Sequence, residues 1–254
     1  MNIIVCIKQT FDTEEKIVLN NNSIDEEGVE YILNPYDEYA VEEALLLKEA
    51  HGGEVTVVAV GPERTVSALQ TALAMGADKA VHVLDDCKGM DEYGAATILA
   101  AILKNRAYNL ILTGNVSVDK GTGQIGPRLA EALDIAQVTS ITKLQLLDGK
   151  KVVLHRDVEG DTEIVETELP ILVSAQQGLN DPRYPSLPGI MKAKKKPIET
   201  IGLEDIAITQ DLCKTAVMEV FLPQKKAAVR ILSGSIQEQV QELAGLLRNE
   251  AKVV

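Results

Sequence analysis

The sequence contains no tryptophan, and aromatic residues make up only 3% of its 254 positions. A stacking platform for single-stranded nucleic acid is therefore not expected. Basic residues are also outnumbered, because 25 Lys and Arg stand against 38 Asp and Glu, and the resulting net charge of −13 repels a phosphate backbone. We expect no nucleic-acid partner.

Long apolar runs and cysteines are equally scarce. No stretch approaches the ~18 consecutive apolar residues that a membrane helix needs, so we do not expect a membrane-embedded chain. The first residues, MNIIVCIKQ, enter a strand pattern without a cleavable signal, which predicts a cytoplasmic location. The three cysteines, Cys6, Cys87 and Cys213, are odd in number and far apart, and they match neither a disulfide framework nor a metal-site spacing.

Catalytic constellations are missing as well. The three histidines, His51, His82 and His155, have no serine, cysteine or carboxylate at a spacing typical of a catalytic pair. A lone histidine is more often a structural residue than a general base. We therefore expect no bond-making chemistry and do not expect an enzyme.

The first half of the chain alternates short apolar runs with helical patterns. Strands are predicted at 2–7, 54–62, 79–84 and 109–114, and helices at 34–51, 65–75, 94–106 and 124–133. This alternation predicts an α/β fold of the Rossmann-like type, with a mainly parallel sheet covered by helices on both faces.

The pattern changes after about residue 136. The segments TSITKLQLL, KKVVLHRDV, DTEIVETEL and PILVSAQ are separated by turn signals at 148–149 and 160–161, and they predict an added β meander. Beyond Pro197 the pattern loosens, and a linker is predicted at 222–226.

The chain closes with an amphipathic helical pattern. Ile236, Val240, Leu243, Leu246 and Leu247 form one apolar stripe behind a plausible N-cap at Ser235. Such a helix packs either on its own domain or on a partner chain, and the pattern alone leaves both open. We divide the chain into an α/β domain at 1–200 and a C-terminal arm with its helix at 201–254.

Three loops follow predicted parallel strands, where open α/β sheets bind ligands. They are residues 8–12, NPYD at 34–37 and GNVSVDKGTGQIGP at 114–127. Glycines let backbone N–H groups approach an anion, and a helix beginning near Gln124 adds partial positive charge. The third loop lacks the Lys-Ser/Thr pair of a P-loop and a clean GxGxxG, so it indicates either nucleotide binding or a structural turn.

Five segments together resemble one family. MNIIVCIKQ, NPYDEYAVEEAL, TALAMGADKAVHV, the 114–127 loop and NDPRYPSLPGIMKAKKKP at 180–197 occur in the order seen in electron transfer flavoprotein β subunits. The resemblance covers the whole chain, and the last segment is its most specific part. It implies a Rossmann-like fold of the adenine nucleotide hydrolase type.

The resemblance also implies partners and cofactors. Such a chain forms a heterodimer with an α subunit that carries most of the contacts to a redox-active FAD, and its own C-terminal arm and helix pack on that subunit. It binds a structural AMP. The heterodimer moves electrons from acyl-CoA dehydrogenases, in fatty acid β-oxidation, to a membrane electron transfer flavoprotein–quinone oxidoreductase.

Two alternatives remain at this point. One is an electron-bifurcating form in which this chain holds a second FAD and the complex oxidises NADH. The other is a free-standing nucleotide-binding sensor of the same architecture.

The nucleotide-binding residues of the family are carried over by position. They are Cys6, Asn34, Pro35, Tyr36, Asp37, Val60, Gly114, Asn115, Val116, Ser117, Val118, Asp119, Lys120, Gly121, Thr122, Gly123, Gln124 and Ile125.

The segment 180–197, here called the docking segment, resembles the family's recognition loop for the dehydrogenase. The residues expected to dock the partner are Tyr184, Leu187, Pro188, Ile190, Met191, Lys192 and Lys195. Its prolines restrict the backbone and reduce the entropy lost on docking, while the lysines orient an encounter without tight binding. A basic turn with Leu187 buried in its own core is the alternative.

Overall fold

The computed structural model describes residues 1–20, 23–147, 150–208, 211–224 and 229–254. The turn predicted at 148–149 lies outside these residues, and so does part of the linker predicted at 222–226.

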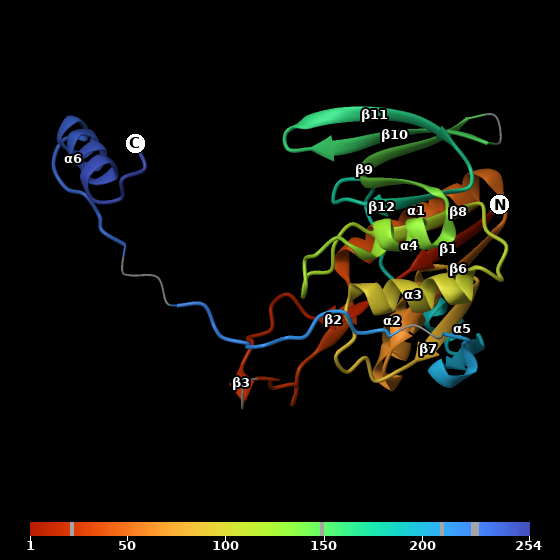
Figure 1. Cartoon of the computed structure of the whole chain (residues 1–254). Helices are drawn as coiled ribbons and strands as arrows, with labels where there is room; N and C mark the ends of the chain where they lie inside the picture. The colour runs from red at the N-terminus through yellow and green to blue at the C-terminus, as the bar shows by residue number, and fades with distance from the viewer. Residues whose placement is uncertain (21–22, 148–149, 209–210, 225–228) are drawn as a thin grey trace.

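A single nine-stranded sheet forms the centre of the body (Figure 1). Its strands are β1 (Asn2–Cys6), β6 (Glu54–Gly61), β7 (Lys79–Leu84), β8 (Leu110–Gly114), β9 (Ala136–Leu147), β10 (Lys151–Val158), β11 (Asp161–Glu168), β12 (Ile171–Ala175) and β13 (Ile198–Gly202). They lie in the order β11-β10-β9-β12-β8-β1-β6-β7-β13. Only the β9–β10 and β10–β11 pairs of this sheet are antiparallel. The predicted mainly parallel α/β fold is confirmed.

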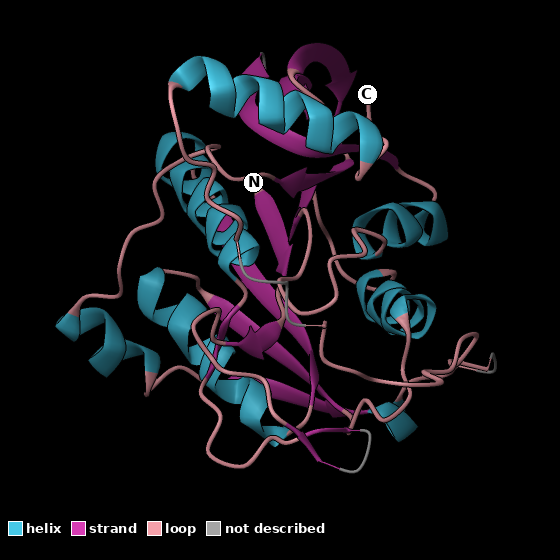
Figure 2. Ribbon diagram, turned by 90° about the vertical axis from the view of Figure 1, so that its left-hand side faces the viewer, coloured by secondary structure: helices cyan, strands magenta, loops and turns pink. Residues whose placement is uncertain are grey.

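Helices cover both faces of this sheet, as Figure 2 shows. They are α1 (Pro35–His51), α2 (Val66–Met75), α3 (Glu92–Leu103), α4 (Ile125–Leu133) and the short α5 (Leu187–Ala193), and the chain ends in α6 (Ile236–Asn249). α1, α2 and α5 bury their apolar residues in a core on one face, and α3 and α4 bury theirs in a second core on the other. Two small sheets pair β2 (Gln9–Phe11) with β5 (Tyr31–Leu33) and β3 (Leu19–Asn20) with β4 (Ser23–Ile24).

Local sequence signals explain where the helices near the site begin. Pro35 occupies the first turn of α1, where its missing N–H costs nothing, and Gly52 ends the same helix. α3 begins after Asp91, whose carboxylate accepts a hydrogen bond from the Gly94 N–H at 3.0 Å. Both helix starts include residues that line the cavity described below.

The prediction for PILVSAQ was wrong in its placement. This segment forms β12, which lies parallel between β8 and β9 inside the main sheet rather than in an antiparallel meander. All five of its residues are buried. A parallel strand covered on both faces is nearly continuously apolar, whereas a half-exposed meander strand alternates. The run ILVSA, which does not alternate, was therefore the signal that distinguishes β12 from the meander strands.

The prediction that the chain loosens beyond Pro197 was also wrong for its first residues. β13 pairs in parallel with β7 and closes the edge of the sheet. The strand spans the boundary between 200 and 201 at which we divided the chain.

The C-terminal helix α6 stands apart from the body in Figure 1. It begins with a capping box in which Ser235 and Glu238 satisfy each other's backbone N–H groups. Ile236, Val240 and Leu243 on its apolar stripe are 81%, 59% and 47% exposed. Within the described ranges, no helix combines the length and apolar character needed to cross a membrane.

Candidate functional site

A cavity of about 480 Å³ opens where the parallel strands end. Cys6 at the end of β1, Gly61 at the end of β6 and Gly114 at the end of β8 all line it. β6, the next strand of the main sheet along the chain, lies on one side of β1, and β8 lies on its other side, so the cavity is at the switch point of the sheet. Ligands of open α/β sheets bind at this place.

Two side chains at the start of α1 hold the loop after β8. The Asn34 amide donates to the Val116 carbonyl at 3.0 Å and accepts from the Val118 N–H at 3.1 Å. The Asp37 carboxylate accepts from the N–H of Gly114 at 2.9 Å and from the N–H of Lys8 at 2.6 Å. Asn34 and Asp37 thus connect the first and last strands of the cavity through one helix start.

Asp37 is almost fully buried, and burial raises the pKa of its carboxyl from 3.8 to about 7. The backbone hydrogen bonds from Lys8 and Gly114 act in the opposite direction. The carboxyl group therefore titrates near neutral pH although its neighbours favour the charged form.

Gly114 is required for this close packing. A Cβ atom at this position would lie 2.3 Å from Oδ1 of Asp37 and 2.9 Å from the backbone carbon of Tyr36. Any larger residue would push β8 and the start of α1 apart.

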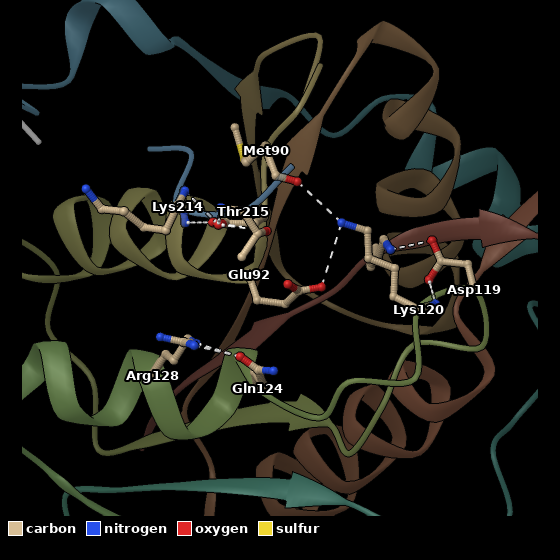
Figure 3. Close-up of polar contacts among 11 residues, drawn as sticks. Met90, Glu92, Asp119, Lys120, Gln124, Arg128, Lys214 and Thr215 are labelled. Carbon is tan, nitrogen blue, oxygen red and sulfur yellow. Dashed lines mark hydrogen bonds and ion pairs between the residues drawn. The ribbon is translucent and has the colours of Figure 1, made fainter. Parts of the chain in front are cut away.

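The glycine-rich loop leads directly into the N-terminus of α4. Gln124 precedes this helix, but its side chain makes no capping bond and instead accepts from the Arg128 guanidinium at 2.7 and 2.9 Å (Figure 3). The first N–H groups of α4 are thus left without a cap from Gln124 at the cavity wall. Such groups, together with the helix dipole, form a favourable place for an anion.

Ion pairs fix the same loop to its neighbours. Lys8 forms a salt bridge with Asp119, and this ammonium, with nearby hydrogen bonds, lowers the pKa of Asp119 although burial alone would raise it. Lys120 reaches across to the start of α3, where it lies 3.3 Å from the Met90 carbonyl and 3.7 Å from Glu92 (Figure 3). The loop is therefore held on both sides of the cavity.

Asp91 beside this contact anchors the C-terminal arm. Its carboxylate accepts from the N–H groups of Lys214 and Thr215 at 2.8 and 2.9 Å. The Gly94 N–H, followed by these two N–H groups, lowers the pKa of Asp91 to about 2. The start of the arm is thus tied to a residue that also lines the cavity.

Two cysteines, Cys6 and Cys87, line the cavity, and their surroundings favour the protonated thiol. Burial raises the pKa of Cys6 to about 12 and that of Cys87 to about 11, and the neighbouring Asp37 and Asp85 carboxylates add to these shifts. A thiol with such a pKa is protonated at neutral pH and is a poor nucleophile. His82 is fully buried, and its Nε2 lies 2.9 Å from the Gly61 carbonyl, so it supports the cavity wall.

The structure brings most of the predicted nucleotide-binding residues to one cavity. Those that line it are Cys6, Asn34, Asp37, Val60, Gly114, Asn115, Val116, Ser117, Asp119, Lys120, Thr122, Gly123, Gln124 and Ile125. Four of the predicted residues do not line the cavity: Pro35, Tyr36, Val118 and Gly121. Pro35 and Tyr36 belong instead to the first turn of α1.

Other lining residues were not predicted as binding residues. They include Lys8, Gln9, Thr10, Phe11, Tyr31, Arg64, Thr65, Lys88, Met90, Asp91 and Thr113. Lys8–Phe11 belong to the loop that the strand-end rule singled out, and the same rule applied to β6 and β7 would have indicated the residues after those strands. Within the described chain, the buried hydroxyl oxygens of Thr10 and Thr113 have no hydrogen-bond partner, as expected of groups that await a ligand.

The docking segment lies on another part of the body, where α5 packs against α2. We expected a loop, but LPGIMKA forms the helix α5, with Ser186 as N-cap and Pro188 in the first turn. Tyr184, Leu187 and Met191 are 94%, 79% and 68% exposed, so Leu187 is not buried in its own core. Pro188, Ile190, Lys192 and Lys195 belong to the same exposed surface, with Ile190 the least exposed of its apolar side chains.

The fold and the cavity define an α/β protein with a ligand site at the switch point of its sheet. The family model "Electron transfer flavoprotein domain" matches residues 21–206. Over the full length of both chains, the sequence is 53% identical to electron transfer flavoprotein subunit beta of Bacillus subtilis and 37% identical to the mitochondrial β subunit of Oryza sativa subsp. indica. It is also 37% identical to the caffeyl-CoA reductase-Etf complex subunit CarD of Acetobacterium woodii, over 99% of this chain and 98% of that protein.

The chain belongs to the electron transfer flavoprotein family, among its β subunits. It is therefore an electron-carrier subunit rather than an enzyme. Membership implies association with a flavin and with an α-subunit partner.

Proposed function

We propose that this chain is the β subunit of an electron shuttle, binds AMP as a structural nucleotide and docks an acyl-CoA dehydrogenase. The FAD lies mainly on the α subunit, and the electrons continue to a membrane quinone oxidoreductase. The observation that supports this proposal best is the cavity at the switch point, which is lined by both the glycine-rich loop and the start of α4.

The charges of the cavity leave the backbone as its main anion-binding surface. Each cation among its described lining residues is paired with a carboxylate: Lys8 with Asp119, Arg64 with Glu26, Lys88 with Asp86 and Lys120 with Glu92. Backbone N–H groups of the glycine-rich loop and of the start of α4 are then the main groups that bind the anionic part of a nucleotide. Carbonyl and hydroxyl groups such as those of Thr10 and Thr113 remain for the ribose and the base.

The bifurcating form is the second candidate. The relative in Acetobacterium woodii is named as part of a caffeyl-CoA reductase-Etf complex, and it matches nearly the whole chain. In such a form this cavity would hold a second FAD, and the complex would oxidise NADH. The free-standing sensor has no comparable support, because the full-length relatives are β subunits.

Nucleotide content separates the two forms. The chain is co-expressed with its α subunit, the purified complex is denatured in acid, and the released nucleotides are separated by chromatography. We expect equal amounts of FAD and AMP. Two FAD molecules and no AMP would assign the complex to the bifurcating form, and FAD alone in equal amount to the heterodimer would contradict a nucleotide in this cavity.

The C-terminal arm is proposed to hold the α subunit. Apolar side chains along it are exposed, including Val217, Met218 and Phe221 at 82%, 92% and 74%, in addition to the stripe of α6. Exposed apolar area of this extent is typical of an interaction surface. Asp91 fixes the start of the arm, so its far end reaches the partner from a defined point.

Docking of the dehydrogenase is proposed to depend on Leu187. Replacing Leu187 by alanine should raise KM for the complex as electron acceptor of an acyl-CoA dehydrogenase about tenfold, because an exposed apolar anchor is lost. Nucleotide content and stability should not change, since the side chain is 79% exposed. Steady-state reduction kinetics measure the effect.

Ile164→Ala provides the control, because it truncates an apolar side chain that is 64% exposed on β11, far from α5 in Figure 1. An unchanged KM for Leu187→Ala would contradict the docking role.

A further inference from the structure

Arg183, at the start of the docking segment, is held by carboxylates of α1. Its Nε and Nη2 donate to the two oxygens of Glu42 at 2.8 and 2.9 Å, and its backbone N–H donates to the same carboxylate at 3.1 Å. Its Nη1 donates to Glu49 at 2.6 Å. These contacts join residues that are more than 130 positions apart in the sequence, so they are tertiary contacts rather than local turns.

The two carboxylates are not equivalent. The side chain of Glu42 is only 5% exposed, whereas that of Glu49 is 57% exposed. A paired, buried carboxylate is strongly favoured over an unpaired one, whereas an exposed ion pair contributes little. Glu42 is therefore the dominant partner of Arg183.

Three further residues, Asn180, Gly189 and Lys196, hold the rest of the segment. Asn180 donates to the Tyr39 carbonyl and to Glu43, each at 3.0 Å. Gly189 packs so closely on the end of α2 that a Cβ atom there would lie 2.4 Å from the Ala74 carbonyl oxygen. At the far end, Lys196 donates to the Ala77 carbonyl.

We propose that Arg183, clamped by Glu42, is a positioning residue that holds the docking segment in its binding conformation before the partner arrives. This inference rests on the proposed docking function and extends it from the contacting side chains to their support. The anchors lie on the body side of the segment, while Tyr184, Leu187 and Met191 face solvent.

The physical advantage is preorganisation. Ordering a loop on binding costs conformational free energy for each residue that becomes fixed. A segment that is already fixed by Glu42, Ala74 and Ala77 avoids this cost, so the encounter can be specific although few side chains make contact. The same helix α1 also holds the nucleotide loop through Asn34 and Asp37, so nucleotide content reports whether α1 itself has been disturbed.

The test uses the complete FAD-containing complex and measures its reduction by an acyl-CoA dehydrogenase. Glu42→Gln removes the charge that holds Arg183, and Gly189→Ala lifts α5 from α2 without touching the clamp. Each should raise KM roughly fivefold to tenfold with little change in kcat, because the reacting flavin is not altered. Glu49→Gln should have a smaller effect, and Glu131→Gln, an exposed carboxylate on α4, serves as the charge-matched control.

Amide hydrogen exchange supplies the second measurement. In the free complex, residues 184–194 of the Glu42→Gln and Gly189→Ala variants should lose protection relative to the wild type, whereas Leu187→Ala should retain it. If Glu42→Gln does not fold, Arg183→Lys keeps the charge, lacks the forked pair of donors and should show the same rise in KM.

The outcomes separate the two proposals. If Leu187→Ala raises KM but Glu42→Gln and Gly189→Ala do not, the segment docks without needing its anchors and the positioning role is wrong. If Leu187→Ala leaves KM unchanged, the docking function itself fails. A fall in kcat at unchanged KM in Glu42→Gln would also overturn the positioning role.

Discussion

Replacing Gly114 by alanine should destabilise the chain by roughly 2–6 kcal/mol and remove the nucleotide from the cavity. The added Cβ would lie 2.3 Å from Oδ1 of Asp37 and 2.8 Å from Cβ of Tyr36. Both neighbours belong to the first turn of α1, which cannot move without breaking its other contacts. Overpacking of this kind costs about 1–3 kcal/mol, and a lost hydrogen bond to a buried carboxyl group adds a similar amount.

The nucleotide should be lost because the loop after β8 depends on the same contact. The N–H of Gly114 donates to Asp37, and the loop that follows supplies much of the cavity wall. Displacing β8 from α1 therefore moves the glycine-rich loop away from the start of α4. Urea unfolding measures the stability, and chromatography of nucleotides released in acid measures the content.

Gly126→Ala is the matched control for this prediction. Gly126 also lines the cavity, but a Cβ there would first meet the Thr113 hydroxyl at 3.2 Å and a methyl of Leu172 at 3.3 Å. These are side-chain atoms that can yield by a few tenths of an ångström, so we expect a cost of about 1 kcal/mol or less. Equal effects of the two substitutions would show that the contact with α1 is not the reason for a glycine at 114.

The sequence was sufficient to predict a mainly parallel sheet with helices on both faces, because apolar strands and helical segments alternate regularly in its first half. The predicted helix starts at residues 34 and 94 lie within two residues of the observed starts of α1 at Pro35 and α3 at Glu92. The location of β12 could not be predicted, because a strand buried on both faces and inserted between two others is fixed by long-range pairing. No local pattern records which strand will be its neighbour.

The candidate site, like the fold, could be predicted only in part. The strand-end rule found the loop at 114–127, and the resemblance named residues that mostly line one cavity. The separate roles of these residues were not predictable. The side chains of Asn34 and Asp37, for example, form hydrogen bonds with the backbone of the loop. Such roles depend on distances between segments some 80 residues apart, which spacing in the sequence does not contain.

The composition of the docking segment, with four prolines and one glycine, predicts a loop. A serine followed within two residues by proline is nevertheless also a helix start, and Ser186 accepts a hydrogen bond from the Gly189 N–H at 3.1 Å. The tertiary packing of Gly189 on α2 decides between the two possibilities. Composition alone favours the wrong one.

The second large effect concerns Asp37, and it depends on pH. Its pKa is about 7 in the folded chain against an ordinary value of 3.8, so the folded state binds a proton more tightly than the unfolded state. Between these two values the folded state carries more protons, and the free energy of unfolding falls as the pH rises. The difference between these two pKa values corresponds to roughly 4 kcal/mol over the whole window.

Asp37→Asn removes this titration and leaves one of the two backbone N–H groups, of Lys8 or Gly114, facing an amide NH₂. The substitution should therefore cost most at or below about pH 4, where the carboxyl group is neutral in the folded wild type and mostly neutral in the unfolded chain, so that its burial carries no charge penalty. The cost should shrink by about 2–4 kcal/mol by roughly pH 8, where the wild type must keep a charge buried. Urea unfolding of both proteins across this range measures the difference.

Thr113→Val is the control for that experiment, since it alters a buried polar group beside Gly114 that does not titrate. Its effect on stability should stay constant over the same pH range. If the cost of Asp37→Asn is equally constant, the buried carboxyl group is not the source of the pH dependence. If the cost grows with pH instead, Asp37 is stabilised as an anion, and the hydrogen bonds from Lys8 and Gly114 outweigh its burial.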